Sequence, residues 1–204
     1  MAGTAWEDLE RGLAARTPAR VTERVRHRAA VAMVLREGTS GLELLLIQRA
    51  EQANDPWSGQ MAFPGGRAEP DDGDLQATAV RETAEELGLD LAADGEFLGA
   101  LDEVQAMARM RPLNLTIQPF VFRLRRDPGA LRLSSEVRSA HWLPLETLRD
   151  PARRGTLDYL HDDIVLDFPC VRIGDLTIWG LTFRMLSNLL EALSAAESGD
   201  KPQP

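Results

Sequence analysis

The chain has 204 residues, of which 44% are hydrophobic and 27% are charged, a composition typical of a soluble globular protein with a sizeable core. Its formal net charge of -9 argues against a long nucleic acid as partner, because such binding draws most of its affinity from clustered Lys and Arg. The single cysteine, Cys170, excludes an internal disulfide and a thiolate metal cluster, and we expect it to be a small buried residue.

No apolar run approaches the roughly 18 residues expected of a membrane span. The N-terminus carries charged residues where a secretory signal would be apolar, so we expect a cytoplasmic protein without a membrane partner. Short phosphorylated ligands remain compatible with the acidic chain, because a divalent cation neutralises phosphates locally. The sequence leaves a homodimer open as the oligomeric state.

The first predicted element is a helix over residues 6–16, whose apolar residues recur at helical spacing and which a Thr-Pro pair closes. We therefore assign residues 1–28 to an N-terminal helical extension. Two strand-like apolar runs, residues 29–35 and 42–47, flank a glycine-containing turn and predict a β-hairpin.

Further strands and helices follow in irregular alternation. Strands are expected at residues 60–63, 96–101, 115–124 and 141–143. Helices are expected at residues 75–89, 145–150 and 181–195. This mixture predicts an α/β sandwich with a mixed sheet, which we assign to one domain over residues 29–195. Residues 196–204 are expected to form a disordered tail.

The helix at residues 75–89 carries the predicted chemistry, with Asp74 as its N-cap and Gly88 as its C-terminal stop. Four residues have the spacing of one core-facing stripe: Val80, Thr83, Ala84 and Leu87. Three glutamates share the opposite side: Glu82, Glu85 and Glu86. Three carboxylates are therefore expected on one surface patch.

A solvated surface is the alternative interpretation of this acidic face, because exposed helices usually show charged faces. Position favours a functional site instead. Glu85 and Glu86 lie in the last turn, where the helix dipole disfavours each anion by about 0.3 to 1 kcal/mol, and the Glu82/Glu86 pair adds about 0.2 to 0.5 kcal/mol of repulsion. A divalent cation would turn this repulsion into attraction. The preceding Gly65-Gly66 pair suits a loop that approaches a ligand or offers a carbonyl to a metal.

Residues 65–89, GGRAEPDDGDLQATAVRETAEELGL, resemble the Nudix box, G-x5-E-x7-R-E-U-x-E-E-x-G-U with U apolar. The second half is matched at every fixed position, by Arg81, Glu82, Glu85, Glu86, Gly88 and Leu89. In the first half, counted from Gly66, Asp72 occupies the glutamate position, and eight residues rather than seven separate it from Arg81. Thr83 stands where an aliphatic residue is usual.

This resemblance implies a Nudix-like α/β/α sandwich with a mixed β-sheet, and hydrolysis of a diphosphate with Mg2+ or Mn2+ as cofactor. It assigns metal binding to Glu82, Glu85, Glu86 and the backbone of Gly66. The resemblance implies three catalytic residues: Arg81, Glu82 and Glu85. Arg81 would orient a glutamate, and Glu82 is the candidate base.

Two further acids are candidates at this site: Asp72 and Glu136. Glu136 precedes a Trp-Leu-Pro-Leu run, where several Nudix enzymes place a late acidic residue. Asp102 and Glu103, at the end of a predicted strand, are alternatives to it. Two arginines could meet a phosphate or adenine, or be solvated loop residues: Arg109 and Arg111.

The departures from the box resemble the coenzyme A pyrophosphatase branch, in which an acidic residue and a Thr-Ala-x-Arg-Glu run recur at this spacing. An upstream motif of that branch, L-L-x-x-R followed by G-x3-F-P-G-G, is fitted by Leu45, Leu46, Arg49, Gly59 and residues 63–66. The interval from Arg49 to Gly59 is one residue longer than in that motif. Asn54 lies near the position where the motif has a second arginine. Residues 178–186, IWGLTFRML, resemble its W-G-x-T-A-R-x-L segment, with Phe183 in place of alanine.

The branch implies coenzyme A or acyl-coenzyme A as substrate, cut to 4'-phosphopantetheine and adenosine 3',5'-bisphosphate, with Arg49, Phe63 and Arg67 at the substrate. The nearest alternative is hydrolysis of ADP-ribose, a nicotinamide dinucleotide or a dinucleoside polyphosphate. A Nudix-like module that senses a nucleotide without cutting it is a different class, and the intact Arg81, Glu82, Glu85 and Glu86 argue against it.

Overall fold

The computed structural model describes residues 5–22, 25–53, 55, 57–108, 111–161 and 164–198. Its helices are α1 (Ala5–Ala14), α2 (Leu75–Leu87), α3 (Leu91–Asp94), α4 (Leu145–Arg149), the 3-10 helix η1 (Pro151–Arg153) and α5 (Gly180–Ser198). The predicted helices are therefore confirmed, with ends shifted by a few residues. Among the described helices, none combines the length and the hydrophobicity that crossing a bilayer requires.

The larger sheet is mixed and has eight strands. They are β1 (His27–Gly38), β2 (Gly41–Arg49), β3 (Met61–Ala62), β4 (Gly65–Arg67), β5 (Gly95–Ala100), β6 (Val104–Ala108), β7 (Arg111–Leu124) and β8 (Val137–Pro144). The order β3-β2-β1-β7-β5 forms its spine, while β4 pairs with β1, β6 with β7 and β8 with β2. Strands β1 and β7 are parallel, and β1 and β2 form the predicted hairpin, closed where Gly38 pairs with Gly41.

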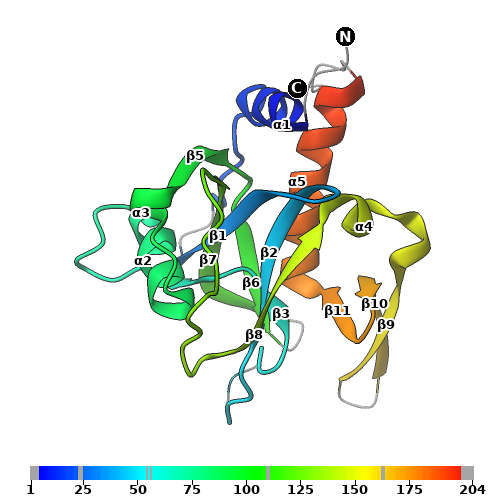
Figure 1. Cartoon of the computed structure of the whole chain (residues 1–204). Helices are drawn as coiled ribbons and strands as arrows, with labels where there is room; N and C mark the ends of the chain where they lie inside the picture. The colour runs from blue at the N-terminus through cyan, green and yellow to red at the C-terminus, as the bar shows by residue number, and fades with distance from the viewer. Residues whose placement is uncertain are drawn as a thin grey trace.

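Strand β1 is buried on both faces, because helices cover the sheet from two sides. Its residues Val31, Met33 and Leu35 share one core cluster with leucines of α5. Its residues Ala30, Ala32 and Val34 share a second cluster with residues of α2. Side chains alternate along a strand, so consecutive residues serve opposite layers. Figure 1 shows α2 and α5 on either side of the sheet, which confirms the predicted α/β/α sandwich.

A second, antiparallel sheet was not predicted. It consists of β9 (Arg154–His161), β10 (Ile164–Ile173) and β11 (Leu176–Trp179), in the order β11-β10-β9 (Figure 1). Pro169 lies inside the central strand, and a proline within a run argues against a central strand. Cys170, also in β10, is fully buried as expected.

The N-terminal extension packs on the C-terminal helix. A Cβ on Gly12 of α1 would overlap the backbone carbonyl of Ala192 in α5, so the small residue allows the two helices to approach closely. Helix α5 continues to Ser198, three residues beyond the predicted end of the domain. Residues 199–204 of the predicted tail lie outside the described residues.

Candidate active site

Helix α2 begins and ends as predicted, but it is rotated relative to its predicted face. The Asp74 side chain accepts a hydrogen bond from the Ala77 amide, and Gly88 has a φ of 65° at the C-terminus. Ala84, expected in the core, is exposed, and Glu86, expected on the surface patch, is only 4% exposed. The three glutamates therefore do not form one exposed patch. The cause is a polar contact, because the Gly65 amide donates to Glu86 Oε2 at 2.9 Å and holds this carboxylate inside.

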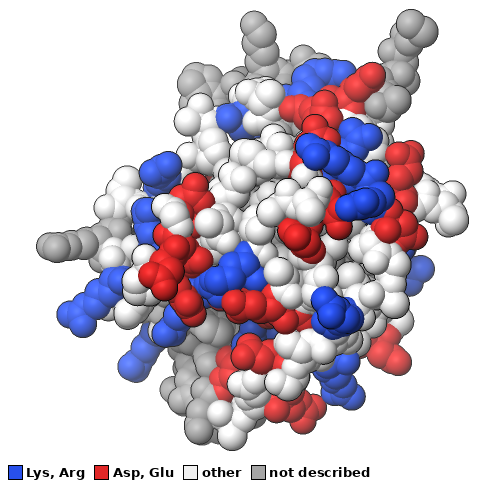
Figure 2. All heavy atoms as spheres, turned by 60° about the vertical axis from the view of Figure 1, so that its left-hand side comes forward, with Lys and Arg blue, Asp and Glu red and all other residues white. Residues whose placement is uncertain are grey.

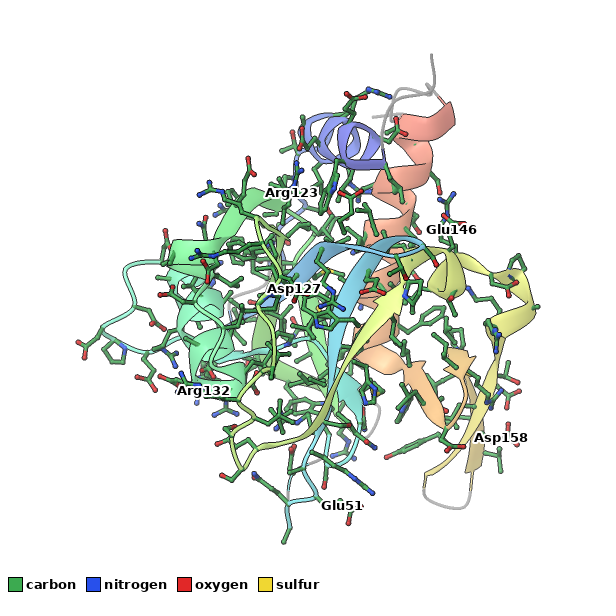
Figure 3. The ribbon with its side chains drawn as sticks, in the orientation of Figure 1. Glu51, Arg123, Asp127, Arg132, Glu146 and Asp158 are labelled. Carbon is green, nitrogen blue, oxygen red and sulfur yellow. The ribbon has the colours of Figure 1, made fainter. Side chains whose placement is uncertain are left out.

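The carbonyls at the C-terminal end of α2 are satisfied by the loop that precedes β8. The Arg132 amide donates to the Leu87 carbonyl at 2.8 Å, and the Ser134 amide donates to the Glu86 carbonyl at 2.9 Å. Arg132 lies beside α2 in Figure 3. Four carbonyls at a helix C-terminus need such partners. The same loop carries Glu136, whose charge adds to the burial that raises the pKa values of Glu82 and Glu86, so this candidate lies within electrostatic reach of the acidic cluster.

Arg81 joins four groups around α2. Its Nε and Nη2 donate to the two carboxylate oxygens of Asp72 at 2.9 and 3.1 Å. Its Nη1 donates to Glu82 Oε1 at 3.0 Å and to Glu85 Oε2 at 3.2 Å, and Nη2 also donates to the Arg67 carbonyl. The predicted orienting role of Arg81 thus has the geometry it requires. Figure 2, with the α2 side turned forward, shows acidic and basic side chains directly side by side there.

Asp72, the residue displaced within the box, is bound within this network. Besides Arg81, it accepts a hydrogen bond from Thr78 Oγ1 at 2.8 Å. The paired Arg81 guanidinium, together with the Glu69 amide, holds the pKa of Asp72 well below its usual range. A carboxylate that is saturated by a bidentate arginine has little left to offer a metal. We therefore interpret Asp72 as a residue that positions Arg81.

The Gly65-Gly66 pair is strand β4 rather than the predicted loop. Gly66 pairs with Ala30 of β1, and a Cβ on Gly66 would overlap the carboxylate of Glu82. Gly65 has a φ of 152°, and a Cβ there would overlap the Ala30 carbonyl. Gly65 therefore excludes a larger residue because the backbone of β1 is in the way, whereas a larger residue at Gly66 would displace the Glu82 carboxylate.

Arg81 and Arg49 offset the negative charge of the acidic cluster only in part. Burial, with the charges of Glu82 and Glu136, raises the pKa of Glu86 to about 7, against the lowering effects of the Gly65 amide and Arg49. Burial also raises the pKa of Glu82, and Arg81 only partly offsets this. Oxygen ligands of this kind suit Mg2+, which takes one or two carboxylates and keeps several waters. The chemistry of the donors thus fits Mg2+, although no group of three acidic, histidine or cysteine side chains within the described part of the chain is already arranged to hold a metal.

A cavity of about 420 Å³ opens beside β4 and brings together the predicted substrate residues. Arg49, Phe63 and Arg67 line it together with Gly65 and Gly66. Phe63 is only 2% exposed and belongs mainly to the core. The guanidinium of Arg49 is held by Asp55 Oδ2, at 2.8 Å from Nη2. Asp55 was not predicted as part of the site, because a single acidic residue in a loop has no recognisable sequence pattern.

The alternative acids serve another purpose. Asp102 accepts from the Ala19 amide at 2.9 Å and Glu103 from the Val21 amide at 3.0 Å, so both fasten the N-terminal extension rather than the acidic cluster. Arg111 is exposed at the start of β7. Arg109 and Asn54 lie outside the described residues.

The layered fold and the acidic helix beside β4 define an α/β/α protein with a candidate site for a divalent cation. The family model for the NUDIX domain matches residues 25–163. The chain therefore belongs to the Nudix hydrolase family.

Several curated proteins are similar to this chain. A protein from Schizosaccharomyces pombe is 46% identical over 117 residues, 55% of this chain and 35% of that protein. The peroxisomal coenzyme A diphosphatase ndx-8 of Caenorhabditis elegans is 32% identical over 59% of this chain and 49% of that protein. The mitochondrial Nudix hydrolase 15 of Arabidopsis thaliana is 30% identical over 78% of this chain and 56% of that protein. The matches thus span 35% to 56% of these relatives' own length.

Solved structures support the fold. A MutT/nudix family protein from Enterococcus faecalis superposes with a TM-score of 0.50 at 19% identity, over 94% of this chain and 73% of that chain. At this identity the likeness concerns the fold alone.

Proposed function

We propose that this chain is a divalent-cation-dependent hydrolase that cleaves the diphosphate bridge of a nucleoside diphosphate derivative. The observation that carries the proposal is the buried Glu86 carboxylate, because its burial and the charges of Glu82 and Glu136 outweigh the effects of the Gly65 amide and Arg49. A buried anionic cluster is unfavourable in isolation and becomes favourable around a cation. The family supplies the reaction class, and the adjoining cavity supplies room for a substrate.

Each residue has a defined task in this proposal. Glu82 and Glu86 are the metal ligands, with exposed Glu85 completing the set and the Gly66 backbone close to Glu82. When bound, Mg2+ would neutralise the diphosphate oxygens and promote ionisation of an attacking water. Arg81 orients the Glu82 carboxylate, the proposed base. Arg49, which Asp55 holds at the cavity wall, contacts the substrate phosphates with Arg67.

As substrate we propose coenzyme A or acyl-coenzyme A, cut to 4'-phosphopantetheine and adenosine 3',5'-bisphosphate. Support comes from the resemblance of the box and of residues 178–186 to the coenzyme A branch, and from the name of the Caenorhabditis elegans relative. ADP-ribose, nicotinamide dinucleotides and dinucleoside polyphosphates are the competing substrates.

A substrate panel tests both levels of this proposal. The purified protein is incubated with coenzyme A, ADP-ribose, NADH and a dinucleoside tetraphosphate, each with Mg2+, Mn2+ or EDTA, and the products are identified by mass. We expect metal-dependent release of 4'-phosphopantetheine. Strong turnover of ADP-ribose beside inert coenzyme A would overturn the substrate. Binding without any metal-dependent product would favour a sensor.

Replacement of Gly66 by alanine is expected to lower kcat/KM about 100-fold, because the added Cβ displaces the Glu82 carboxylate and a shift of about 1 Å has this effect on reactivity. Gly73→Ala is the matched control, since a Cβ there meets no atom within 4 Å. Steady-state kinetics of both variants checks the prediction. Equal kinetics in the two variants would contradict the placement of Glu82 in the site.

The stability of the metal-free protein is expected to fall as the pH rises from about 4.5 to about 7. In this window the folded state keeps the proton on Glu86, whose pKa is raised from 4.5 to about 7, whereas the unfolded state has lost it. Mg2+ binds the ionised carboxylate, so it is expected to raise the Tm more at about pH 8 than at about pH 5. Thermal unfolding with Mg2+ and with EDTA measures this. An equal Tm increase at both pH values would contradict it.

A further inference from the structure

A second cavity, of about 470 Å³, adjoins the cavity beside β4. Trp57, Gln60 and Leu181 line both cavities, so the two meet at these residues. Each part has the size of a small-molecule site, for which about 300 to 1,000 Å³ is usual. A substrate whose diphosphate lies beside Gly65 and Gly66 can therefore extend past Trp57 into the second cavity.

We call this second cavity the aromatic pocket, because aromatic side chains of the second sheet form one of its walls. Trp179 pairs with Cys170, which lies two residues from Phe168, and Leu157, two residues from Tyr159, pairs with Phe168. The two-residue period of strands therefore puts three rings on one face: Tyr159, Phe168 and Trp179. Their ring centroids are 5.5 to 5.9 Å apart. All three side chains are partly exposed.

Helix α5 forms another part of the wall. Leu181 and Phe183 contribute apolar surface from its first turn. Arg184 is the single basic residue among the described residues that line the pocket, and Glu191 lines the same cavity. The cavity beside β4, in contrast, has Arg49 and Arg67 in its wall. The charge distribution thus suits phosphates beside β4 and an uncharged group in the aromatic pocket.

We propose that the aromatic pocket is a specificity subsite that binds an apolar chain carried by the diphosphate substrate, such as the acyl group of an acyl thioester. This inference rests on the proposed function. A chain fits better than a planar base, because the three rings are inclined to one another by 37° to 81° and so present no parallel slot for stacking. Phe183, which replaces the alanine of the related segment, narrows the pocket.

Asp55 connects the two halves of the site. Its Oδ1 accepts a hydrogen bond from the Trp57 amide at 3.0 Å, and its Oδ2 binds Arg49 at 2.8 Å. Burial raises the pKa of Asp55, but the hydrogen bonds from Trp57 and Arg49 outweigh it and the net shift is downward, so the carboxylate stays ionised. The Asp55 side chain therefore holds both Trp57, at the junction of the two cavities, and Arg49, near the acidic cluster.

The first test is the dependence of kcat/KM on chain length, from free coenzyme A through acetyl-, butanoyl-, hexanoyl- and octanoyl-coenzyme A. Burial of each methylene is expected to raise kcat/KM about two- to fourfold until the pocket is full. Phe168→Ala is expected to lower the octanoyl-to-free ratio about tenfold. Phe183→Ala is expected to shift the optimum to longer chains, because it removes a wall of the pocket.

Phe97→Ala is the matched control. Phe97 is 45% exposed on β5 and contacts Phe120 and Phe122, so its removal also breaks ring contacts but leaves the aromatic pocket intact. We expect its chain-length profile to match that of the wild type. A flat wild-type profile, or a profile that neither Phe168→Ala nor Phe183→Ala alters, would overturn the proposal.

A binding measurement separates this proposal from the proposed function. Calorimetric titration with coenzyme A and with octanoyl-coenzyme A in EDTA requires no turnover. Tighter binding of the octanoyl compound, reduced by Phe168→Ala and not by Phe97→Ala, supports the aromatic pocket even if no substrate is cleaved. Equal affinities for both compounds would reject it even if coenzyme A is hydrolysed. Stronger binding of free adenosine 3',5'-bisphosphate in the same pocket would indicate a base site instead.

Discussion

Replacement of Glu86 by glutamine is expected to reduce metal-dependent turnover at least about 100-fold and, at the same time, to stabilise the metal-free protein by about 1 to 3 kcal/mol above pH 7. The two effects have one cause. The charge that binds the cation is also the charge that the buried site tolerates least without it. Glutamine keeps an oxygen that can accept the Gly65 amide, so the local hydrogen bond is retained.

The stability gain corresponds to a rise in Tm of about 2 to 12 °C in EDTA. Glu146→Gln is the matched control, because its side chain is 76% exposed and its pair with Arg149 spans one helical turn. This control is expected to change neither turnover nor the Tm appreciably. Near-normal turnover of Glu86→Gln would show that the Glu86 carboxylate is not a ligand of the proposed metal site. A lower Tm of this variant in EDTA would show that the charge of Glu86 does not destabilise the metal-free protein.

The elements that sequence analysis located have strong local signals. The hairpin of β1 and β2 follows from two apolar runs around a turn, and α2 follows from Asp74 and Gly88 at its ends. Strands β9 to β11 lack such signals because Pro169 interrupts the central one. Their pairing becomes favourable only when the face with Val171 and Ile178 joins the core around α5.

The structure brings several of the predicted site residues together, but in an arrangement that the sequence did not predict. Periodicity classes a glutamate as polar, so it placed Glu86 with Glu82 and Glu85 on the surface. The Gly65 amide that draws Glu86 inward lies 21 residues away in the sequence, beyond the reach of a helical pattern. The role of Asp72 likewise depends on Arg81, nine residues further along the chain.

Replacement of Arg81 by lysine is expected to lower the stability by about 2 to 3 kcal/mol and the Tm by about 4 to 12 °C, because one ammonium group cannot make the bidentate contact with Asp72 and also reach Glu82. The Asp72 side chain is 7% exposed, so its carboxylate loses a partner where water compensates little. Turnover is expected to fall at least about tenfold, because Glu82 loses its orientation. Arg138→Lys is the matched control, since its pair with Glu51 is exposed on both sides.

A double-mutant cycle separates the two contacts of Arg81. If the stability of the site depends on the pair with Asp72, the losses from Arg81→Lys and Asp72→Asn are not additive, and the double variant is little less stable than either single variant. The effect of Arg81 on turnover depends instead on its contact with Glu82. Asp72→Asn retains the Arg81 contact with Glu82, so it is expected to keep more activity than Arg81→Lys at equal stability. Equal loss of activity in both single variants would mean that Arg81 orients Glu82 only while Asp72 holds the guanidinium in place.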